Sequence, residues 1–387
     1  MTSSTLTASL PPTTASTNSK KILQELVGHA DIEFNGSHPL DIQINDERFY
    51  RRVLRDGTLG FGEAYMDGWW DAEQIDETVH RLLRSDLQDQ LKNPKALLSY
   101  IGAVLINKAR PSKAFEIGEK HYDLGNNLFE VMLDARMVYT CGYWKNARTL
   151  DEAQEAKLDL VCRKVGLKPG DRVLDIGCGW GSFLKFAAEN YGVTGVGITV
   201  STEQVGLAEE NLAGLPLEIR LQDYRALNGE EKFDHVVSLG MFEHVGYKNY
   251  PLYMDVVDRN LKDDGFFLLH TIGIRHSSKS TDPWIDKYIF PNSMLPSILQ
   301  IGKASEKRFV MEDLHNFSSD YDRTLMAWYE NFKNGWDALK SDYNERFYRM
   351  WKYFLLSCAG SFRARNTQLW QIVFSKKGVP GGYESIR

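Results

Sequence analysis

Short apolar runs alternate with longer amphipathic stretches from about residue 115 onward. This alternation is typical of a mostly parallel β-sheet whose two faces are covered by helices. We expect strands at residues 172–176, 193–198, 217–221, 235–239, 266–270 and 369–375, with helices between the first five. The pattern therefore predicts a doubly wound α/β domain.

Local signals mark the start of this sheet and a long segment before its last strand. Thr149 is followed three residues later by Glu152, the spacing of a helix capping box, and Pro169 with Gly170 indicates the turn into the first strand. Residues 277–362 form a long insertion rich in Trp, Tyr and Phe. Insertions of this kind commonly build the substrate side of a pocket.

The region before this domain has a different pattern, which predicts a smaller mixed α+β domain. Residues 32–34 and 41–44 resemble strands, and residues 57–71 are rich in glycine and aromatic side chains. The GxG in that stretch follows no strand, so we interpret it as a tight packing turn rather than a phosphate loop. Trp69 and Trp70 are expected to belong to the core.

An apolar stretch at residues 97–106 is flanked by basic residues: Lys92, Lys95, Lys108, Arg110 and Lys113. Two interpretations are open: a helix that enters a membrane interface, or an inter-domain core helix that ends in a solvated basic linker. Pro111 and Ser112 then mark the boundary between a domain at residues 21–113 and a second at residues 114–387. The Ser/Thr-rich residues 1–20 are expected to be a disordered tail.

Length and charge restrict the possible functions. A chain of 387 residues is too long for one ordinary core, which agrees with two domains. The net charge of −6 gives no general attraction to nucleic acid, so no nucleic-acid partner is expected. The apolar runs are far shorter than the ~20 residues that span a bilayer.

The cysteines and histidines point away from metal chemistry. Cys141, Cys162, Cys178 and Cys358 are scattered and form no CxxC pair, so reduced thiols in a cytoplasm are expected. The nine histidines form no HxxxH or Cys/His ligand spacing, and we predict no metal.

The strongest local signal is VLDIGCGWG at residues 173–181, a buried strand that runs into glycines and then into a helix from about Ser182. Gly177, Cys178 and Gly179 lie where doubly wound sheets bind their ligands. A dinucleotide site would instead prefer GxGxxG with an acid about twenty residues on. The GxGxG spacing after Asp175 resembles class I S-adenosylmethionine methyltransferases, which implies that cofactor and a seven-stranded sheet.

Polar residues after the second and third strands complete the expected cofactor site. Thr199 stands where most members of that class carry an acid for the ribose, so Thr199 and Gln204 are candidates for the ribose or methionine end. Gln222 and Asp223 follow the third strand, where the adenine is usually held. A surface turn is the alternative interpretation of that pair.

Two residues after the fourth and fifth strands are candidates for the reaction itself. Glu243 follows the fourth strand and His270 ends the fifth, so both are expected at the rim of the sheet that holds the cofactor. A carboxyl group and an imidazole at one rim can hold or move a proton.

Four segments carry a more specific resemblance: HYDLGNNLFEVMLD (121–134), YTCGYW (139–144), GMFEHVGYKNY (240–250) and LLHTIG (268–273). Blocks at 282–292, 315–332 and 358–376 extend it over nearly the whole chain. The chain resembles the long-form cyclopropane-fatty-acyl-phospholipid synthases, which have an amino-terminal lipid-binding domain. The resemblance implies transfer of a methylene group from S-adenosylmethionine to the cis double bond of phospholipid acyl chains.

The resemblance also implies a bound bicarbonate ion as the base of the reaction, held by residues that match Cys141, Glu243, His270, Ile272 and Tyr321. The His270 ring, the Tyr321 hydroxyl and backbone N–H groups of Cys141 and Ile272 can donate to this anion, while Glu243 can accept the bicarbonate's own proton. This division of roles avoids placing two unshielded negative charges together.

By the same residue-by-residue match, Tyr139 would lie over the cofactor, and Tyr122 and His244 near the reaction centre. Cys141 could alternatively act as a nucleophile, but the reaction needs no covalent intermediate, so we prefer its backbone role. Cys358 is interpreted as a buried packing residue, with a catalytic role as the alternative.

The resemblance further implies peripheral association with a phospholipid bilayer at the cytoplasmic face of the cell membrane, and a homodimer. The nearest alternative function is a methyltransferase that acts on another alkene lipid, such as a sterol, or leaves a branched methyl group. The acidic balance disfavours RNA methylation. A non-enzymatic protein with a dead cofactor fold is disfavoured by the retained Asp175, Gly177, Gly179, Glu243 and His270.

Overall fold

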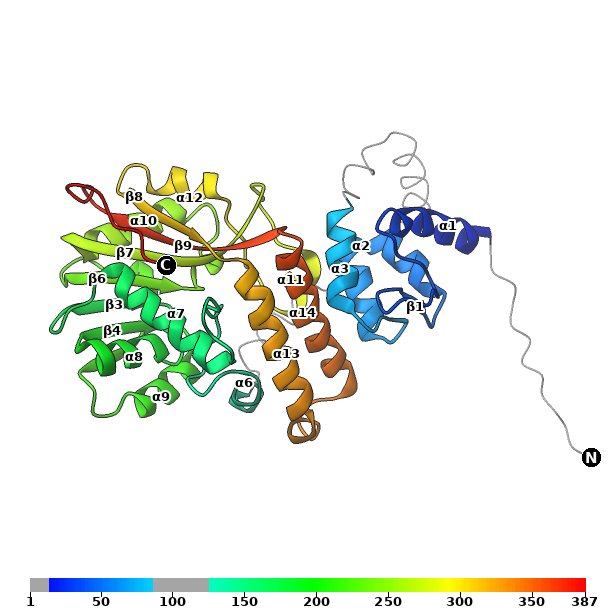
Figure 1. Cartoon of the computed structure of the whole chain (residues 1–387), viewed down its shortest axis with the longest axis horizontal. Helices are drawn as coiled ribbons and strands as arrows, with labels where there is room; N and C mark the ends of the chain where they lie inside the picture. The colour runs from blue at the N-terminus through cyan, green and yellow to red at the C-terminus, as the bar shows by residue number, and fades with distance from the viewer. Residues whose placement is uncertain (1–13, 86–124) are drawn as a thin grey trace, which may run out of the picture. The chain divides into compact units, whose positions relative to one another are not determined.

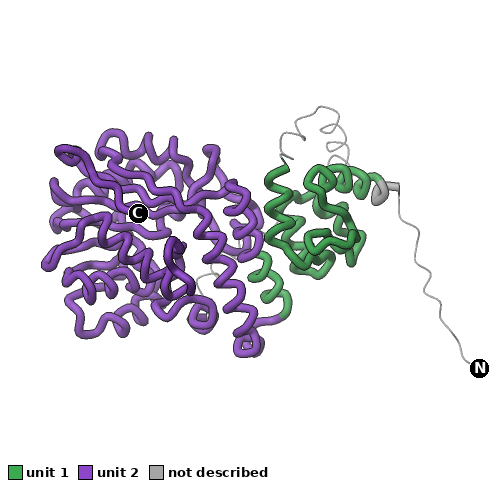
Figure 2. The backbone as a smooth tube through the Cα atoms, viewed as in Figure 1, with its two compact units in different colours: residues 1–114, 345–353 green, residues 115–344, 354–387 purple. Residues whose placement is uncertain are grey.

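The computed structural model describes residues 14–85 and 125–387. The chain divides into two compact units, residues 1–114 with 345–353 and residues 115–344 with 354–387 (Figure 2). The boundary predicted from the sequence, between residues 113 and 114, lies one residue from the division between residues 114 and 115. The sequence pattern also places residues 345–353 in the second domain, whereas they belong to the first unit.

The second unit is built on a seven-stranded sheet in the order β5-β4-β3-β6-β7-β9-β8 (Figure 1). Neighbouring strands are parallel except at β9, which runs antiparallel to β7 and β8. The strands are β3 (Arg172–Ile176), β4 (Thr194–Thr199), β5 (Leu217–Leu221), β6 (Phe233–Leu239), β7 (Leu261–Ile274), β8 (Val310–Asn316) and β9 (Thr367–Ser375). The predicted doubly wound, mostly parallel sheet is confirmed.

Burial explains which strands the sequence pattern detects. Residues 173–176 of β3 are all buried, as expected for a parallel strand covered on both faces. β8 is the strand that the pattern misses, because it lies at the sheet edge and its first residues, Val310 and Met311, are exposed. Such a strand gives neither a buried run nor a clean alternation.

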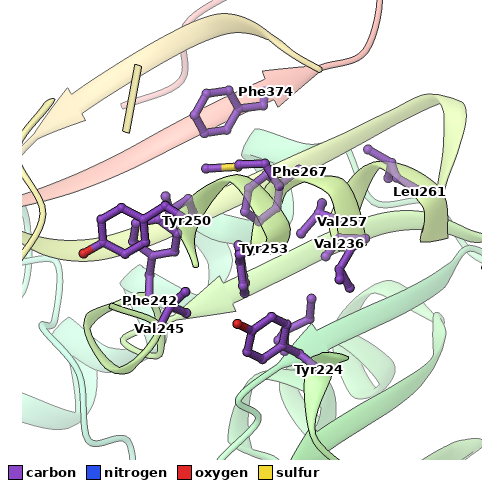
Figure 3. Packing of buried hydrophobic residues seen from close by; sticks show 14 of the residues in the cluster. Tyr224, Val236, Phe242, Val245, Tyr250, Tyr253, Val257, Leu261, Phe267 and Phe374 are labelled. Carbon is purple, nitrogen blue, oxygen red and sulfur yellow. The ribbon is translucent and has the colours of Figure 1, made fainter. Parts of the chain in front are cut away.

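Helices cover both faces of the sheet. On one face, α7 (Leu150–Val165) and α8 (Ser182–Tyr191) contribute to a core that also contains Val173, Val237 and Leu268. On the other face, α10 (Tyr250–Asn260) and α12 (Ile298–Ser305) enclose a core with Leu174, Val236 and Phe267 (Figure 3). Successive residues of one strand thus belong to opposite cores, which follows from the two-residue period of a strand.

The predicted capping box is confirmed, because Thr149 and Glu152 make both of its hydrogen bonds at the start of α7. α9 (Thr202–Asn211) follows β4 as expected. The helix predicted between β5 and β6 is wrong, since that connection holds only the 3₁₀ turn η2 (Tyr224–Ala226). Asn228 and Gly229 follow it, and Gly229 has a φ of +85°, which ends any helical path.

The unit contains further described elements, some of which carry candidate site residues. They are α6 (Asn126–Met132), η3 (Phe242–His244), α11 (Pro283–Tyr288), α13 (Ser319–Leu339) and the later part of α14 (Glu345–Arg363). Most of them lie in the aromatic segment that the sequence presents as an insertion. That segment also contains α12 and β8, so it supplies one strand of the sheet and one of the helices that cover it.

The first unit is mainly helical. It contains α1 (Thr14–Gly28), α2 (Arg48–Met66) and α3 (Ile75–Arg84), with an antiparallel pair of short strands, β1 (Gln43–Ile44) and β2 (Trp70–Asp71). The strand expected at residues 32–34 is wrong, because only an isolated bridge joins Phe34 to Ile42. α1 begins at Thr14 and so includes the last residues of the predicted tail.

The packing turn predicted in the glycine-rich stretch is also wrong, because residues up to Met66 belong to α2. The helix is kinked at Gly57, which has a φ of 59°. A Cβ at Gly60 would lie 2.6 Å from the Arg52 carbonyl oxygen, so only glycine fits there. Trp70 is fully buried, which confirms its place in the core, whereas Trp69 is half-buried.

Residues 345–353 join the first unit through specific contacts. The Arg349 guanidinium donates from Nε to the Tyr65 carbonyl at 2.6 Å and from Nη2 to the Trp70 carbonyl at 2.9 Å. The Tyr353 ring stacks on the Tyr65 ring with 5.6 Å between centroids. Because Arg349 lies 284 residues from Tyr65 and 279 from Trp70 in sequence, no local pattern predicts these contacts.

Several sequence-based predictions fall outside the described residues. They concern residues 1–13, the apolar stretch 97–106 with its flanking basic residues, and Tyr122. Among the helices that the structure describes, none is long and apolar enough to cross a membrane.

Candidate active site

The glycine loop after β3 brings the main chain to the carboxyl edge of the sheet in an unusual conformation. Gly177, Gly179 and Gly181 have φ values of +88°, +55° and +80°. The N–H groups of Gly177 and Cys178 donate to the Ile198 carbonyl at 2.9 and 3.1 Å, which fixes the loop to the end of β4. Left-handed backbone at three positions explains why glycine is needed in this motif.

Close packing adds a second requirement for glycine. A Cβ at Gly177 would lie 2.5 Å from the Met241 Cβ, so the loop can pass Met241, which follows β6, only without a side chain. A Cβ at Gly197 on β4 would lie 2.8 Å from the Cys178 sulfur. Cys178 is buried, and this burial raises the pKa of its thiol well above the ordinary value. Its side chain therefore packs as a neutral group beneath the loop.

Asp175 lies near the end of β3 and is 2% exposed. Among the described residues, its Oδ1 has no hydrogen-bond partner. Burial raises the pKa of Asp175 to about 7, and the positive charge of Lys157 opposes this shift. A buried carboxyl oxygen that lacks a partner needs a hydrogen-bond donor or a positive charge beside it. The amino group of S-adenosylmethionine is such a group, and the neighbouring glycine loop leaves room for a ligand.

The ends of β4 and β5 bring three predicted cofactor residues together. The Thr199 hydroxyl donates to Gln204 Oε1 at 2.7 Å, and the Gln222 N–H donates to the Thr199 carbonyl at 2.9 Å. Asp223 has a different environment, because it forms an ion pair of 2.6 Å with Arg225 and caps η2. The hydrogen bond from Arg225 lowers the pKa of Asp223. A ligand would have to share this carboxylate with Arg225, which the sequence analysis missed.

Glu243 occupies η3, directly after β6, and is 5% exposed. Its Oε1 accepts a hydrogen bond of 2.6 Å from the Ile272 N–H of β7. Its Oε2 has no partner in the part of the chain that the structure describes. Burial raises the pKa of Glu243 to about 7, so the carboxyl can both bind and release a proton near neutral pH.

His270 lies on β7 and is 1% exposed. Its Nδ1 is 3.2 Å from Nε2 of Gln371 on β9. Its Nε2 has no partner within residues 14–85 and 125–387. Burial, with smaller effects from Lys157 and Lys164, holds the pKa of His270 well below its ordinary value. The ring is therefore neutral.

Tyr321 and Cys141 are buried neutral groups in the same region. The Tyr321 ring stacks on Phe362 with 4.5 Å between centroids. Burial raises the pKa of Tyr321 well above the ordinary value, and electrostatic interactions with Cys141, Tyr139 and Glu243 raise it further. Burial also raises the pKa of the Cys141 thiol, which argues against a thiolate nucleophile.

The segment that carries Tyr139 and Cys141 is held by residues that the sequence analysis missed. Gln154 and Lys157 on α7 donate to the Thr140 carbonyl at 2.7 Å and the Thr140 hydroxyl at 2.8 Å. The Thr324 hydroxyl on α13 accepts from the Gly142 N–H at 3.1 Å. Buried polar residues in amphipathic helices are a weak sequence signal, and only their contacts reveal these roles.

Aromatic rings surround the other predicted residues. The Tyr139 ring lies 5.2 Å from those of Phe129 and Trp328, and the exposed His244 ring lies 5.9 Å from that of Phe290. Phe290 is also 6.5 Å from Tyr139. The structure thus brings Tyr139 and His244 to the same aromatic cluster.

Two negative findings concern the cysteines and metals. The four cysteines are free, and Cys358 is partly buried, whereas the sequence analysis expects a buried packing residue there. Within the two described stretches, no cluster of three His, Cys, Asp or Glu side chains could hold a metal ion.

Known proteins resemble the chain in sequence and in structure. The family model "Mycolic acid cyclopropane synthetase" matches residues 109–372. The cyclopropane-fatty-acyl-phospholipid synthase of Escherichia coli K12 is 53% identical over 368 residues, which are 95% of this chain and 96% of that protein.

Solved structures of cyclopropane synthases share the fold of a large part of the chain. MmaA2 from Mycobacterium tuberculosis is 30% identical, with a TM-score of 0.63, over 70% of this chain and 100% of that one. The mycolic acid cyclopropane synthase CmaA1, solved with S-adenosylhomocysteine, is 31% identical, with a TM-score of 0.61, over the same shares.

Proposed function

The chain belongs to the cyclopropane synthetase family of S-adenosylmethionine-dependent enzymes, and from this premise we propose that it forms cyclopropane rings at the cis double bonds of acyl chains in membrane phospholipids. The match to the Escherichia coli phospholipid enzyme over 95% of the chain supports this substrate class. The observation that carries the proposal is the buried Glu243 carboxyl at the sheet rim that also holds the cofactor loop; within the described part of the chain its Oε2 has no hydrogen-bond partner.

The cofactor residues can bind and orient the donor. S-adenosylmethionine supplies an activated methyl group on a positively charged sulfur. Asp175 offers its Oδ1, which no other described residue hydrogen-bonds, and the glycine loop lets the main chain approach the ligand closely. The aromatic rings around Tyr139 can stabilise the positive charge while they exclude water.

An alkene has no acidic proton to lose before it attacks the methyl group. The carbocation that results from methyl transfer must lose a proton from the new methyl group to close the ring, so the reaction needs an acceptor for that proton. We propose that a bicarbonate ion, which can take up that proton, binds between His270, Glu243 and Tyr321. His270 Nε2 and Glu243 Oε2 are buried polar atoms that lack partners among the described residues, and a small polar ligand would satisfy both.

The hydrogen bonds refine the role proposed for Ile272. Its N–H already donates to Glu243 Oε1 at 2.6 Å, so it orients the carboxyl and can reach an anion only as a shared donor. The donors that remain for bicarbonate are the His270 ring, the Tyr321 hydroxyl and the Cys141 N–H. Because the side chains are neutral and buried, they can hold an anion away from bulk water.

Membrane contact and assembly are further parts of the proposal. We propose that the chain works at a bilayer surface, that its first unit recruits phospholipid, and that it acts as a homodimer at the cytoplasmic face of the membrane. The match to the Escherichia coli phospholipid enzyme covers 95% of the chain and so extends into the first unit.

Product analysis tests the proposed reaction. The full chain is incubated with S-adenosylmethionine and vesicles of an unsaturated phospholipid, and the released fatty acids are analysed by mass spectrometry and proton NMR. We expect a gain of one CH₂ together with high-field cyclopropyl protons and loss of the alkene signals. A product that gains CH₂ but keeps its alkene protons would instead identify a methyl-branching enzyme.

A further inference from the structure

One row of side chains, buried at His270 and Gln371 and half-buried at His315, crosses the antiparallel side of the sheet. His270 on β7 pairs with Gln371 on β9, and Gln371 pairs in turn with His315 on β8. Paired residues of neighbouring strands present their side chains on the same face. Gln371 therefore lies between two imidazoles, and its amide can bond to one of them.

The contact is to His270. Gln371 is completely buried, and its Nε2 is 3.2 Å from His270 Nδ1. His315 has another partner, because its Nδ1 is 3.1 Å from Lys164 Nζ. Among the residues described, neither Gln371 Oε1 nor His270 Nε2 has a hydrogen-bond partner.

An amide nitrogen can only donate a hydrogen bond, so the ring nitrogen that faces it must carry no proton. In a neutral imidazole the single N–H is then at Nε2. The charged groups that act on His270 are Lys157 and Lys164 of α7, and both disfavour the doubly protonated ring. The contact with Gln371 thus sets which face of His270 is a donor.

We propose that Gln371 is a positioning residue that selects the Nε2–H form of His270, so that the ring offers a donor to the anionic proton acceptor of the site. This inference rests on the proposed function, because it assigns the Nε2–H, which has no partner among the described residues, to an anion. Gln371 acts only through His270. Its role is to keep a hydrogen-bond donor, rather than an acceptor, directed at a site that binds negative charge.

The Gln371→Glu substitution reverses this selection in a pH-dependent way. At low pH the introduced carboxyl and His270 together hold an extra proton, either on the carboxyl or on the ring, and Nε2 keeps its hydrogen in both cases. When the pair loses that proton, the carboxylate accepts from Nδ1–H and Nε2 becomes bare. The Gln371→Met substitution removes the amide without adding a titratable group.

NMR of the full chain labelled with ¹⁵N-histidine tests the inference without any turnover. The His270 signals are identified by their absence from the His270→Gln spectrum. We expect Nε2–H and an unprotonated Nδ1 in the wild type, and Nδ1–H in Gln371→Glu at high pH. A wild-type ring that carries its proton on Nδ1 would overturn the proposal.

Activity profiles give the second measurement. Gln371→Glu is expected to retain activity at low pH and to lose roughly 10-fold or more as pH rises, whereas Gln371→Met loses activity at every pH. Gln368→Glu, on the same strand, is the matched control, because its Oε1 accepts from Asn316 and a carboxylate can do the same. Parallel profiles for Gln371→Glu and wild type would contradict the inference.

Failure of the inference can be separated from failure of the proposed function. Wild-type turnover is measured in bicarbonate-depleted buffer and after bicarbonate is restored. Loss and recovery of activity support the bicarbonate site whatever the His270 tautomer is. If His270 carries its proton on Nε2 but turnover does not depend on bicarbonate, the bicarbonate site is wrong and the tautomer assignment stands.

Discussion

At the scale of single residues, Glu243 and His270 share one arrangement. Each has one polar atom fixed by a neighbouring strand, Ile272 N–H for Glu243 and Gln371 Nε2 for His270, and one without a partner among the described residues. The fixed atom orients the side chain, and the other remains for a ligand. The sequence could place both residues at one rim from strand ends, but it could not identify the atoms that hold them.

Glu243→Gln is expected to reduce turnover by roughly 10²-fold or more while S-adenosylmethionine affinity is kept, because only the proton-accepting carboxyl is removed. Steady-state kinetics and calorimetry measure the two quantities. Glu230→Gln, an exposed substitution of the same kind, is the control. Near-normal turnover in Glu243→Gln would remove this residue from the mechanism.

The raised pKa of Glu243 also predicts a change in stability with pH. Its folded-state pKa of about 7 lies above the ordinary value, so its stabilising contribution is complete below about pH 4.5 and is lost as pH rises through about 7. The loss amounts to at most about 3 kcal/mol. The Tm of Glu243→Gln minus that of the wild type should therefore rise between pH 5 and pH 8. If this Tm difference is the same at both pH values, the pKa of Glu243 is not raised by burial.

Thr324 supports the site from α13 and offers a test of packing. Its hydroxyl accepts from the Gly142 N–H at 3.1 Å and from Trp144 Nε1 at 2.9 Å. Thr324→Val keeps the shape but leaves two buried donors unpaired, so the free energy of unfolding should fall by roughly 2 kcal/mol or more. Thr324→Ser keeps the hydroxyl and should lose much less. Equal denaturant midpoints for the two variants would show that these hydrogen bonds are weak.

At the scale of elements, the sequence predicts what is buried and locally periodic. The run at β3, the glycine loop and the capping box at Thr149 are found as expected. The pattern does not predict the edge strand β8, because its first residues are exposed. It also does not predict that residues 57–66 are part of a helix, because glycines are unfavourable in helices. Contacts such as Thr324 to Gly142 join residues 182 positions apart, which no local pattern reveals.

The glycine loop can be tested by two matched glycine substitutions. Gly177→Ala should weaken S-adenosylmethionine binding by roughly 10-fold or more, because the position has a φ of +88° and a Cβ would collide with Met241. Gly206→Ala, in α9, meets no atom within 4 Å and should bind normally. Calorimetry on both proteins gives the affinities. Normal affinity for Gly177→Ala would show that the loop does not form the cofactor site.

At the scale of the whole molecule, one helix belongs to both units. Residues 345–353 of α14 pack within the first unit, and the rest of the helix belongs to the second. A fragment that began near residue 115 would leave Arg349 and Tyr353 without the Tyr65 contacts that they make in the first unit. The proposed role of the first unit in recruiting phospholipid is therefore best tested in the full chain.

Arg349→Met is expected to destabilise the first unit by roughly 2 kcal/mol, because the Tyr65 and Trp70 carbonyls lose their donor. Arg346→Met removes an exposed ion pair to Asp67 and should have little effect. Scanning calorimetry should show a lowered transition for Arg349→Met, with S-adenosylmethionine affinity unchanged. Equal unfolding of the two variants would contradict the assignment of residues 345–353 to this unit.

The central claim is that a methyl group is transferred to an alkene and then loses a proton to close a ring. The most direct test uses S-adenosylmethionine with a fully deuterated methyl group, the full chain and unsaturated phospholipid vesicles, with mass analysis of the acyl chains. The account predicts that the added carbon keeps all but one of its deuterons, as a ring CD₂. An added carbon that keeps every deuteron, as CD₃, would contradict it.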